Sequence, residues 1–178
     1  MGANVMGKYQ SEIKKAMTKL GKRDDVLFLG QGVAYPDRIY GTLEDVPIEK
    51  CIEMPIAENM QTGIAIGLAL EGFYPVSIYQ RMDFLLLASD QLINHLDKIK
   101  SMSQGQYNPC VMTRTIIGAK KPLDAGPQHT QDFTKLFKTG LNNVAVVNLL
   151  NDREVKSVYS DCNKNNTNIL VIEKRELY

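Results

Sequence analysis

Three side chains of types that often take part in chemistry stand out in this sequence: Glu58, Phe84 and His129. A carboxyl group can share a proton with a bound ligand, and in a dry pocket desolvation raises its pKa. Imidazole transfers protons near neutral pH. The carboxyl group and the imidazole are typical of an acid–base site, with an aromatic ring as a third member, provided that the fold brings them together.

Each of the three residues comes after an apolar run bounded by turn residues. Six such runs are expected to be strands: 26–30, 51–56, 75–79, 110–115, 144–150 and 169–173. Several are unbroken rather than alternating, which is typical of strands buried on both faces of a parallel sheet. Glu58 follows the second run, Phe84 follows the third, and His129 lies in the loop after the fourth. Ligands bind beyond the carboxyl ends of parallel strands, so we expect the three side chains at one rim.

Helical patterns lie between these runs. The stretches expected to be helical are 8–22, 57–71, 83–101 and 152–165. In the first of them Ile13, Met17 and Leu20 form one apolar stripe, and Gly21 is a stop signal. Strands that alternate with helices predict an α/β fold, a single doubly wound domain over residues 1–178 with a mostly parallel sheet of about six strands.

Composition and charge exclude several classes of protein. The 178 residues suffice for one compact domain, and 44% hydrophobic and 23% charged residues are ordinary for a globular chain. A net charge of +1 gives no reason to expect a nucleic-acid or membrane partner. No apolar stretch approaches the length of a membrane span, and the N-terminal segment lacks the apolar core of a signal peptide. Three widely spaced cysteines fit no disulfide framework or zinc site, so we expect a cytoplasmic protein without its own metal site.

Gly63 and Gly67 leave one face of the helix 57–71 almost bare of side chains. Glycine in a helix interior costs about 1 kcal/mol relative to alanine. Close packing within the domain or against another chain would offset that cost. A phosphate-binding loop is not indicated, because no glycine-rich strand-to-helix turn is present here.

An ordered set of motifs across nearly the whole chain resembles the pyrimidine-binding domain of thiamine diphosphate enzymes. The motifs are "PIAE" (55–58), "GIAIGLALEGFYPV" (63–76), "DFLLLASDQLINHLDKIKSMS" (83–103), "GPQHTQ" (126–131) and "ILVIEKRELY" (169–178). The similarity is greatest to the beta subunit of the pyruvate or 2-oxo acid dehydrogenase decarboxylating component. Transketolase shares the glutamate and the glycine-bearing helix.

The resemblance implies roles for four residues. Glu58 would hydrogen-bond a nitrogen of the cofactor's aminopyrimidine ring and favour the tautomer that removes the thiazolium proton. Phe84 would stack on the pyrimidine, Ile56 would also contact the cofactor, and His129 would act near the substrate. From the residues alone other roles stay open: Glu58 as an acid that favours a helix N-terminus, Phe84 as a core aromatic, and His129 as a surface residue.

The family divides its cofactor site between two domains, and this chain lacks the GDG motif of the diphosphate-binding domain. The resemblance therefore implies an alpha-like partner that holds the diphosphate and Mg²⁺, and an α2β2-type assembly. We therefore expect that this chain carries neither a diphosphate-binding domain nor a C-terminal transketolase-type domain. The expected reaction is decarboxylation of a 2-oxo acid with acyl or aldehyde transfer.

The sequence is also compatible with two alternatives. The chain could be the C-terminal half of a split transketolase acting on sugar phosphates, which basic residues at the rim would favour. It could also be a non-catalytic assembly domain, which intact Glu58, Phe84 and His129 disfavour. Lys120 and Lys121 either meet an anionic group or keep their loop soluble.

Overall fold

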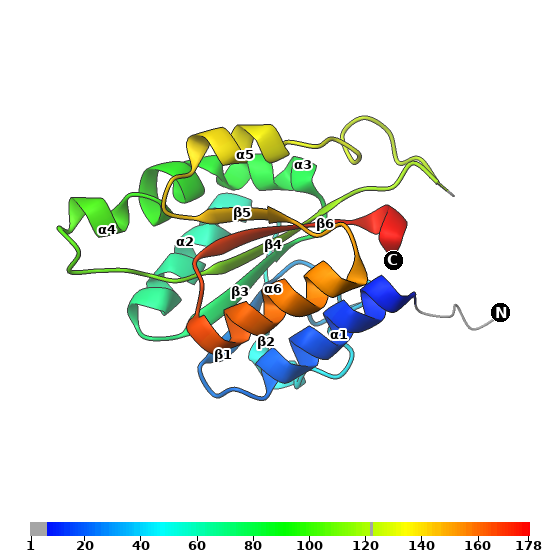
Figure 1. Ribbon diagram of the computed structural model, residues 1–178, viewed down its shortest axis with the longest axis horizontal. Helices are drawn as coiled ribbons and strands as arrows, with labels where there is room; N and C mark the ends of the chain where they lie inside the picture. The colour runs from blue at the N-terminus through cyan, green and yellow to red at the C-terminus, as the bar shows by residue number, and fades with distance from the viewer. Residues whose placement is uncertain (1–6, 122) are drawn as a thin grey trace.

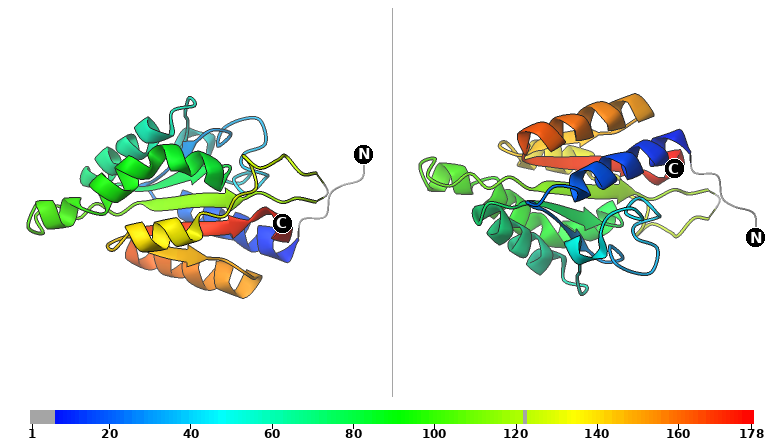
Figure 2. Two further views of the ribbon diagram at one scale, coloured as in Figure 1. Left: turned by 90° about the horizontal axis from the view of Figure 1, so that it is seen from above. Right: turned by 90° about the horizontal axis from the view of Figure 1, so that it is seen from below.

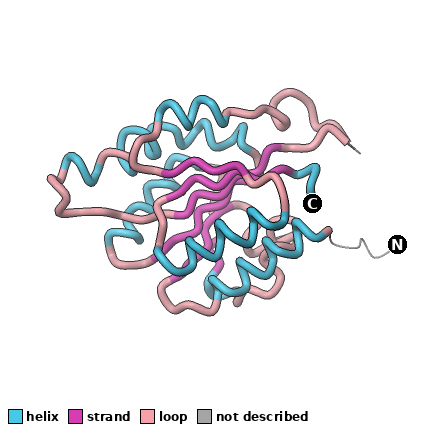
Figure 3. Tube along the Cα trace, viewed as in Figure 1, coloured by secondary structure: helices cyan, strands magenta, loops and turns pink. Residues whose placement is uncertain are grey.

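A computed structural model describes residues 7–121 and 123–178 of the chain. Six parallel strands form one sheet in the order β2-β1-β3-β4-β6-β5. The strands are β1 (Val26–Gly30), β2 (Cys51–Glu53), β3 (Tyr74–Tyr79), β4 (Met112–Ile117), β5 (Ala145–Asn148) and β6 (Ile169–Lys174). Figure 3 shows the strands as a central layer between two layers of helix. The predicted α/β doubly wound sheet is confirmed.

Burial follows the apolar runs of the sequence. Every residue of β3 is buried, and so are all but one residue at the end of β4 and of β6. These three strands lie side by side in the middle of the sheet. β2 at the edge has no fully buried residue. A strand with both faces covered needs apolar side chains on both, which explains the unbroken runs.

Helices cover both faces of the sheet (Figures 1 and 2). They are α1 (Lys8–Gly21), α2 (Glu58–Leu70), α3 (Met82–Leu85), α4 (Ile99–Met102), α5 (Thr134–Gly140) and α6 (Asp152–Asn165). α1 and α6 lie side by side on one face and pack on the first core cluster through Ile13, Met17 and Val155. α2, α3 and α5 pack on the second cluster, on the other face. No helix in the part of the chain that the structure describes is long and apolar enough to cross a membrane.

Two predicted elements differ from the structure. The strand expected over 51–56 ends at Glu53. Pro55 has no N–H to donate to a neighbouring strand, and so the chain leaves the sheet before it. The other five strands agree with their predicted bounds to within two residues at each end.

The single helix predicted over 83–101 is divided into short pieces. After α3 come a 3₁₀ turn over Leu86–Ala88, a π-helix over Gln91–Leu96 and then α4. Asp97, directly after the π-helix, is fully buried. Its carboxylate accepts hydrogen bonds from the backbone N–H groups of Asn142 and Asn143, at 2.7 and 2.6 Å. The division of the helix therefore accompanies a tertiary contact to the loop before β5.

Candidate active site

Glu58 is the first residue of α2 and is only 5% exposed. Its backbone carbonyl accepts a hydrogen bond from Thr62 Oγ1 at 3.1 Å, as expected in the first turn of a helix. Its carboxylate has no hydrogen-bond partner among residues 7–121 and 123–178. The carboxylate lines the hollow described below, where it is available for a hydrogen bond to a ligand.

Glu53, five residues earlier, shows the contrasting case. Its carboxylate accepts hydrogen bonds from the backbone N–H groups of Gly32 and Ala34, the latter at 2.8 Å. Glu53 therefore fixes the loop after β1. Of the two neighbouring glutamates, the structure uses one as an anchor and leaves the carboxylate of Glu58 available.

The Glu58 side chain lines a small hollow at the carboxyl ends of β1 and β3. The other residues that line it are Gln31, Gln61, Ile78, Tyr79, Gln80 and Phe84. The predicted pair Glu58 and Phe84 is thus brought together. The volume is about 10 Å³, which is roughly the space of one water molecule. An aromatic ring does not fit inside it and would have to lie on its open side.

The floor of the hollow is polar and firmly held. Gln61 Nε2 donates to Ser77 Oγ at 3.0 Å and to the carbonyl of Ile78 at 3.1 Å, so that α2 is tied to β3. The hydroxyl of Tyr79 is hydrogen-bonded with Thr62 Oγ1 at 2.5 Å. Burial and, to a smaller extent, the nearby charge of Glu58 raise the pKa of Tyr79 to about 12. Tyr79 therefore stays a neutral phenol at physiological pH.

His129 lies against Phe84. The two ring centroids are 5.4 Å apart with the planes at 84°, an edge-to-face contact. The Nδ1 atom of His129 is buried and has no hydrogen-bond partner within the described chain. The three predicted side chains therefore lie next to one another: Phe84 lines the same hollow as Glu58, and its ring contacts that of His129.

The long loop after β4 is fixed where it passes over α3. A Cβ atom on Gly118 would lie 1.9 Å from the carbonyl oxygen of His129, so only glycine allows these two backbone segments to meet. Gln131 Nε2 donates to Asp83 Oδ1 at 2.9 Å. These contacts hold His129 beside Phe84.

The structure adds residues that the sequence reading did not single out. Gln61 follows Glu58 by three residues and so lies on the same side of α2, a spacing that could have identified it. Ile56 is 84% exposed and is not part of the lining of the hollow; its role as a cofactor contact stays a prediction. Among the described residues, no group of three or more His, Cys, Asp or Glu side chains could hold a metal ion.

Comparison with known proteins gives a match over nearly the whole chain. Residues 8–178 match the family described as "Transketolase, pyrimidine binding domain". The pyruvate dehydrogenase E1 component subunit beta of Cyanidium caldarium is 33% identical over 133 residues, which cover 71% of this chain and 40% of that protein. The mitochondrial human protein of the same name is 30% identical over 173 residues, or 93% of this chain and 47% of that one.

The fold has a counterpart among solved structures. A split-gene transketolase, described as an inactive β4 tetramer, superposes with a TM-score of 0.68 over 96% of this chain and 52% of that one, at 18% identity. The chain spans less than half the length of the two curated relatives above. With the family match and the geometry of the hollow taken together, the chain belongs to the transketolase pyrimidine-binding domain family.

Proposed function

We propose that this chain is the beta-like half-site of a thiamine diphosphate-dependent enzyme. The observation that carries the proposal is the unpartnered carboxylate of Glu58, in the same hollow as Phe84. The family implies thiamine diphosphate as the cofactor. The curated relatives favour a small 2-oxo acid as substrate, with decarboxylation and acyl transfer as the reaction.

The residues present fit the aminopyrimidine end of that cofactor. Glu58 would hold a proton between its carboxylate and a ring nitrogen. Phe84 offers an aromatic face for stacking, and His129 beside it would transfer protons at the substrate. When bound, the cofactor supplies the nucleophilic carbon that adds to a substrate carbonyl.

The proposed site is completed by a second chain. The hollow is about 10 Å³, so the described residues offer one wall for a ring rather than a closed pocket. We place the diphosphate and its Mg²⁺ on an alpha-like partner, because a diphosphate is usually held through the metal. The substrate would enter between the two chains.

The isolated chain is expected to bind thiamine diphosphate poorly. Phe84 and Glu58 would contact only the ring of the cofactor, so the interactions that bind its charged diphosphate end would be missing. Titration calorimetry of the purified chain with thiamine diphosphate and MgCl₂ measures this directly. Micromolar, magnesium-dependent binding without a partner would refute the half-site proposal.

The outer face of α2 supports the proposed assembly. Gly67 is exposed, and a Cβ atom there would meet no atom within 4 Å. Met60 and Ile64 on the same helix are also exposed, at 45% and 39%. The helix cost of Gly67 is therefore not offset by packing in the described chain, and contact with another chain would offset it. We propose that α2 packs against a second copy or the partner chain.

Replacing Gly67 with leucine should separate folding from assembly. In the monomer the substitution is expected to be neutral or to stabilise α2 by up to about 0.8 kcal/mol, because leucine is a far better helix former. In the assembly the side chain would block close approach. Light scattering should then give a lower mass for Gly67→Leu, while cooperative thermal unfolding shows that the variant is still folded.

A matched control is Ser157→Leu, which adds leucine at an exposed position of α6. This variant should keep the wild-type mass. If Gly67→Leu also keeps it, α2 does not form the interface.

A second candidate function is the C-terminal half of a split transketolase acting on sugar phosphates. Basic side chains at the rim favour it: Arg81 follows β3 and Arg175 follows β6. The fold similarity to a split-gene transketolase is compatible with both candidates. A non-catalytic assembly domain would give no reason to keep the carboxylate of Glu58 free. The substrate of the reconstituted complex separates the first two.

A further inference from the structure

A second, larger pocket lies beside the hollow, at the same rim of the sheet. Its volume is about 500 Å³, within the range of small-molecule sites. Arg81, at the end of β3, and Arg175, at the end of β6, bring guanidinium groups to it, and Lys121 adds an ammonium. Glu176 is the acid in the lining, and it lies 4.0 Å from Lys174.

Both guanidinium groups are placed on the ring of Tyr40. The Cζ atom of Arg175 lies 4.4 Å from the centroid of that ring, and that of Arg81 lies 5.4 Å from it. Arg175 also lies 4.9 Å from the ring centroid of Tyr178. The two tyrosine rings meet edge to face, with centroids 6.0 Å apart. The aromatic rings thus form a platform that holds two like charges close together.

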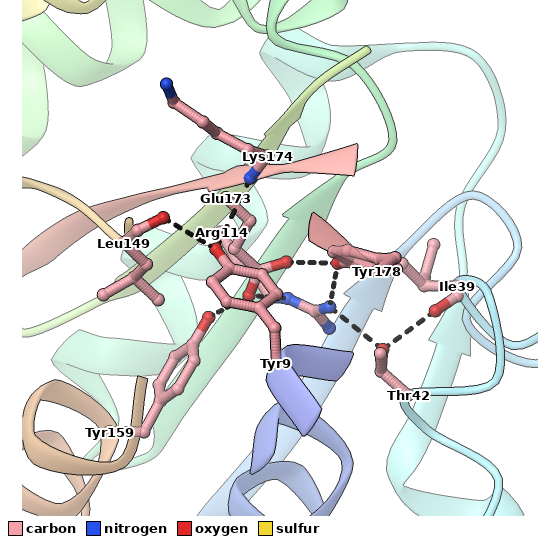
Figure 4. Close-up of polar contacts among 9 residues, drawn as sticks. All are labelled: Tyr9, Ile39, Thr42, Arg114, Leu149, Tyr159, Glu173, Lys174 and Tyr178. Atoms are coloured by element: carbon pink, nitrogen blue, oxygen red, sulfur yellow. Dashed lines mark hydrogen bonds and ion pairs between the residues drawn. The ribbon is translucent and has the colours of Figure 1, made fainter. Parts of the chain in front are cut away.

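This platform is rigid. The hydroxyl of Tyr178 donates to the buried carboxylate of Glu173 at 2.5 Å and accepts from Arg114 at 3.1 Å. Figure 4 shows Tyr178 held in this way. The hydroxyl of Tyr40 accepts a hydrogen bond from Arg81. The two tyrosine rings would therefore lose little side-chain entropy when a ligand binds.

The two arginines lack a compensating carboxylate. Neither forms an ion pair with any residue in 7–121 or 123–178. Nε of Arg81 is buried and has no hydrogen-bond acceptor there. Repulsion between two half-buried guanidinium groups is relieved most directly by an anion, and their planar forks match phosphate and carboxylate oxygens.

We propose that the pocket between Arg81, Arg175 and Tyr40 binds the anionic group of a small ligand, a phosphate or a carboxylate. Arg81 comes directly after Gln80, which lines the hollow of Glu58 and Phe84. An anion held here would therefore lie next to the cofactor site. That this anion is part of the substrate rests on the proposed function, but anion binding itself does not.

The test uses the full chain and inorganic phosphate as the probe. Titration followed by the Nε–H signals of ¹⁵N-labelled arginine side chains should show saturable shifts of Arg81 and Arg175. Arg81→Gln and Arg175→Gln should each weaken binding roughly tenfold, as expected for the loss of one charge-assisted hydrogen-bonding group. Arg153→Gln, the same change at an exposed position of α6, should leave the affinity unchanged.

Further arms identify the source of the anion. Tighter binding of ribose 5-phosphate than of ribose assigns the pocket to phosphate, whereas displacement of phosphate by pyruvate assigns it to a carboxylate.

Thermal unfolding of each variant checks the fold, and Arg175→Lys should recover part of the affinity that Arg175→Gln loses. The proposal is overturned if wild type shows no saturable binding, or if all three glutamine variants bind alike. Neither the cofactor nor a partner is needed, so a failed half-site proposal would leave this result intact.

Discussion

Glu58→Gln should slow proton exchange at the thiazolium carbon of the bound cofactor by about 100- to 10,000-fold in the reconstituted complex, the usual range for an acid–base group. This is roughly 3–5 kcal/mol of activation free energy. Glutamine keeps the size of the side chain and its ability to form hydrogen bonds. It cannot take up and release the proton that Glu58 would share with the ring nitrogen. Cofactor affinity should therefore change only modestly.

Deuterium exchange followed by NMR isolates this step from all later chemistry. Calorimetry on the same complex first establishes that each variant is loaded with cofactor. The matched control is Glu71→Gln, which makes the same change at an exposed residue just after α2. A loaded Glu58→Gln complex that exchanges at the wild-type rate would leave Glu58 with no role beyond the start of the helix.

Much of the fold could be predicted from the sequence because its central strands are buried on both faces. Apolar runs such as 169–173 leave little room for another element, and five strands agree closely with expectation. The prediction of one continuous helix over 83–101 is wrong in detail, because the division of this segment into short helices accompanies a contact with a distant part of the chain. Asp97 bonds backbone groups 45 and 46 residues away, which no local pattern reveals.

Part of the candidate site could likewise be predicted from the sequence, and part of it depends on the tertiary fold. The positions of the predicted strand ends place Glu58, Phe84 and His129 at one rim of the sheet. In the structure Glu58 and Phe84 line the same hollow, and the ring of Phe84 contacts that of His129. The role of Gly118 could not be predicted, because it depends on a loop that folds back onto the glycine. Tyr40 and Arg175 are far apart in the sequence, and only the tertiary fold places the guanidinium group of Arg175 on the ring of Tyr40.

The floor under that platform is a buried polar cluster around Glu173 (Figure 4). Its carboxylate accepts hydrogen bonds from Arg114 Nε at 2.8 Å and from the hydroxyls of Tyr159 and Tyr178. Arg114 also donates to Thr42 Oγ1 at 2.9 Å. Burial, together with the charge of Glu173, raises the pKa of both tyrosines well above the usual value, so they remain donors. The cluster joins β4, β6 and α6.

Among the changes considered, removal of one member of the buried Arg114–Glu173 ion pair is expected to reduce the stability of the fold most. Glu173→Leu leaves the guanidinium of Arg114 buried without its counter-ion, which should cost about 3–5 kcal/mol. Domains of this kind are stable by only about 5–15 kcal/mol, so a large part of the native state's stability would be lost. Arg114→Met should also destabilise, by leaving a buried carboxylate held only by tyrosines.

The double variant Arg114→Met/Glu173→Leu should cost clearly less than the two single changes added together, because neither charge is then left alone. Urea unfolding of the four proteins gives this coupling energy. The exposed pair Lys15 and Glu12, 2.6 Å apart, is the control, and the same cycle there should give about 0–1 kcal/mol. If the buried cycle gave no more than the exposed one, solvent would have to reach Arg114. The cluster would then not be the rigid support that holds Tyr178 beneath the arginines.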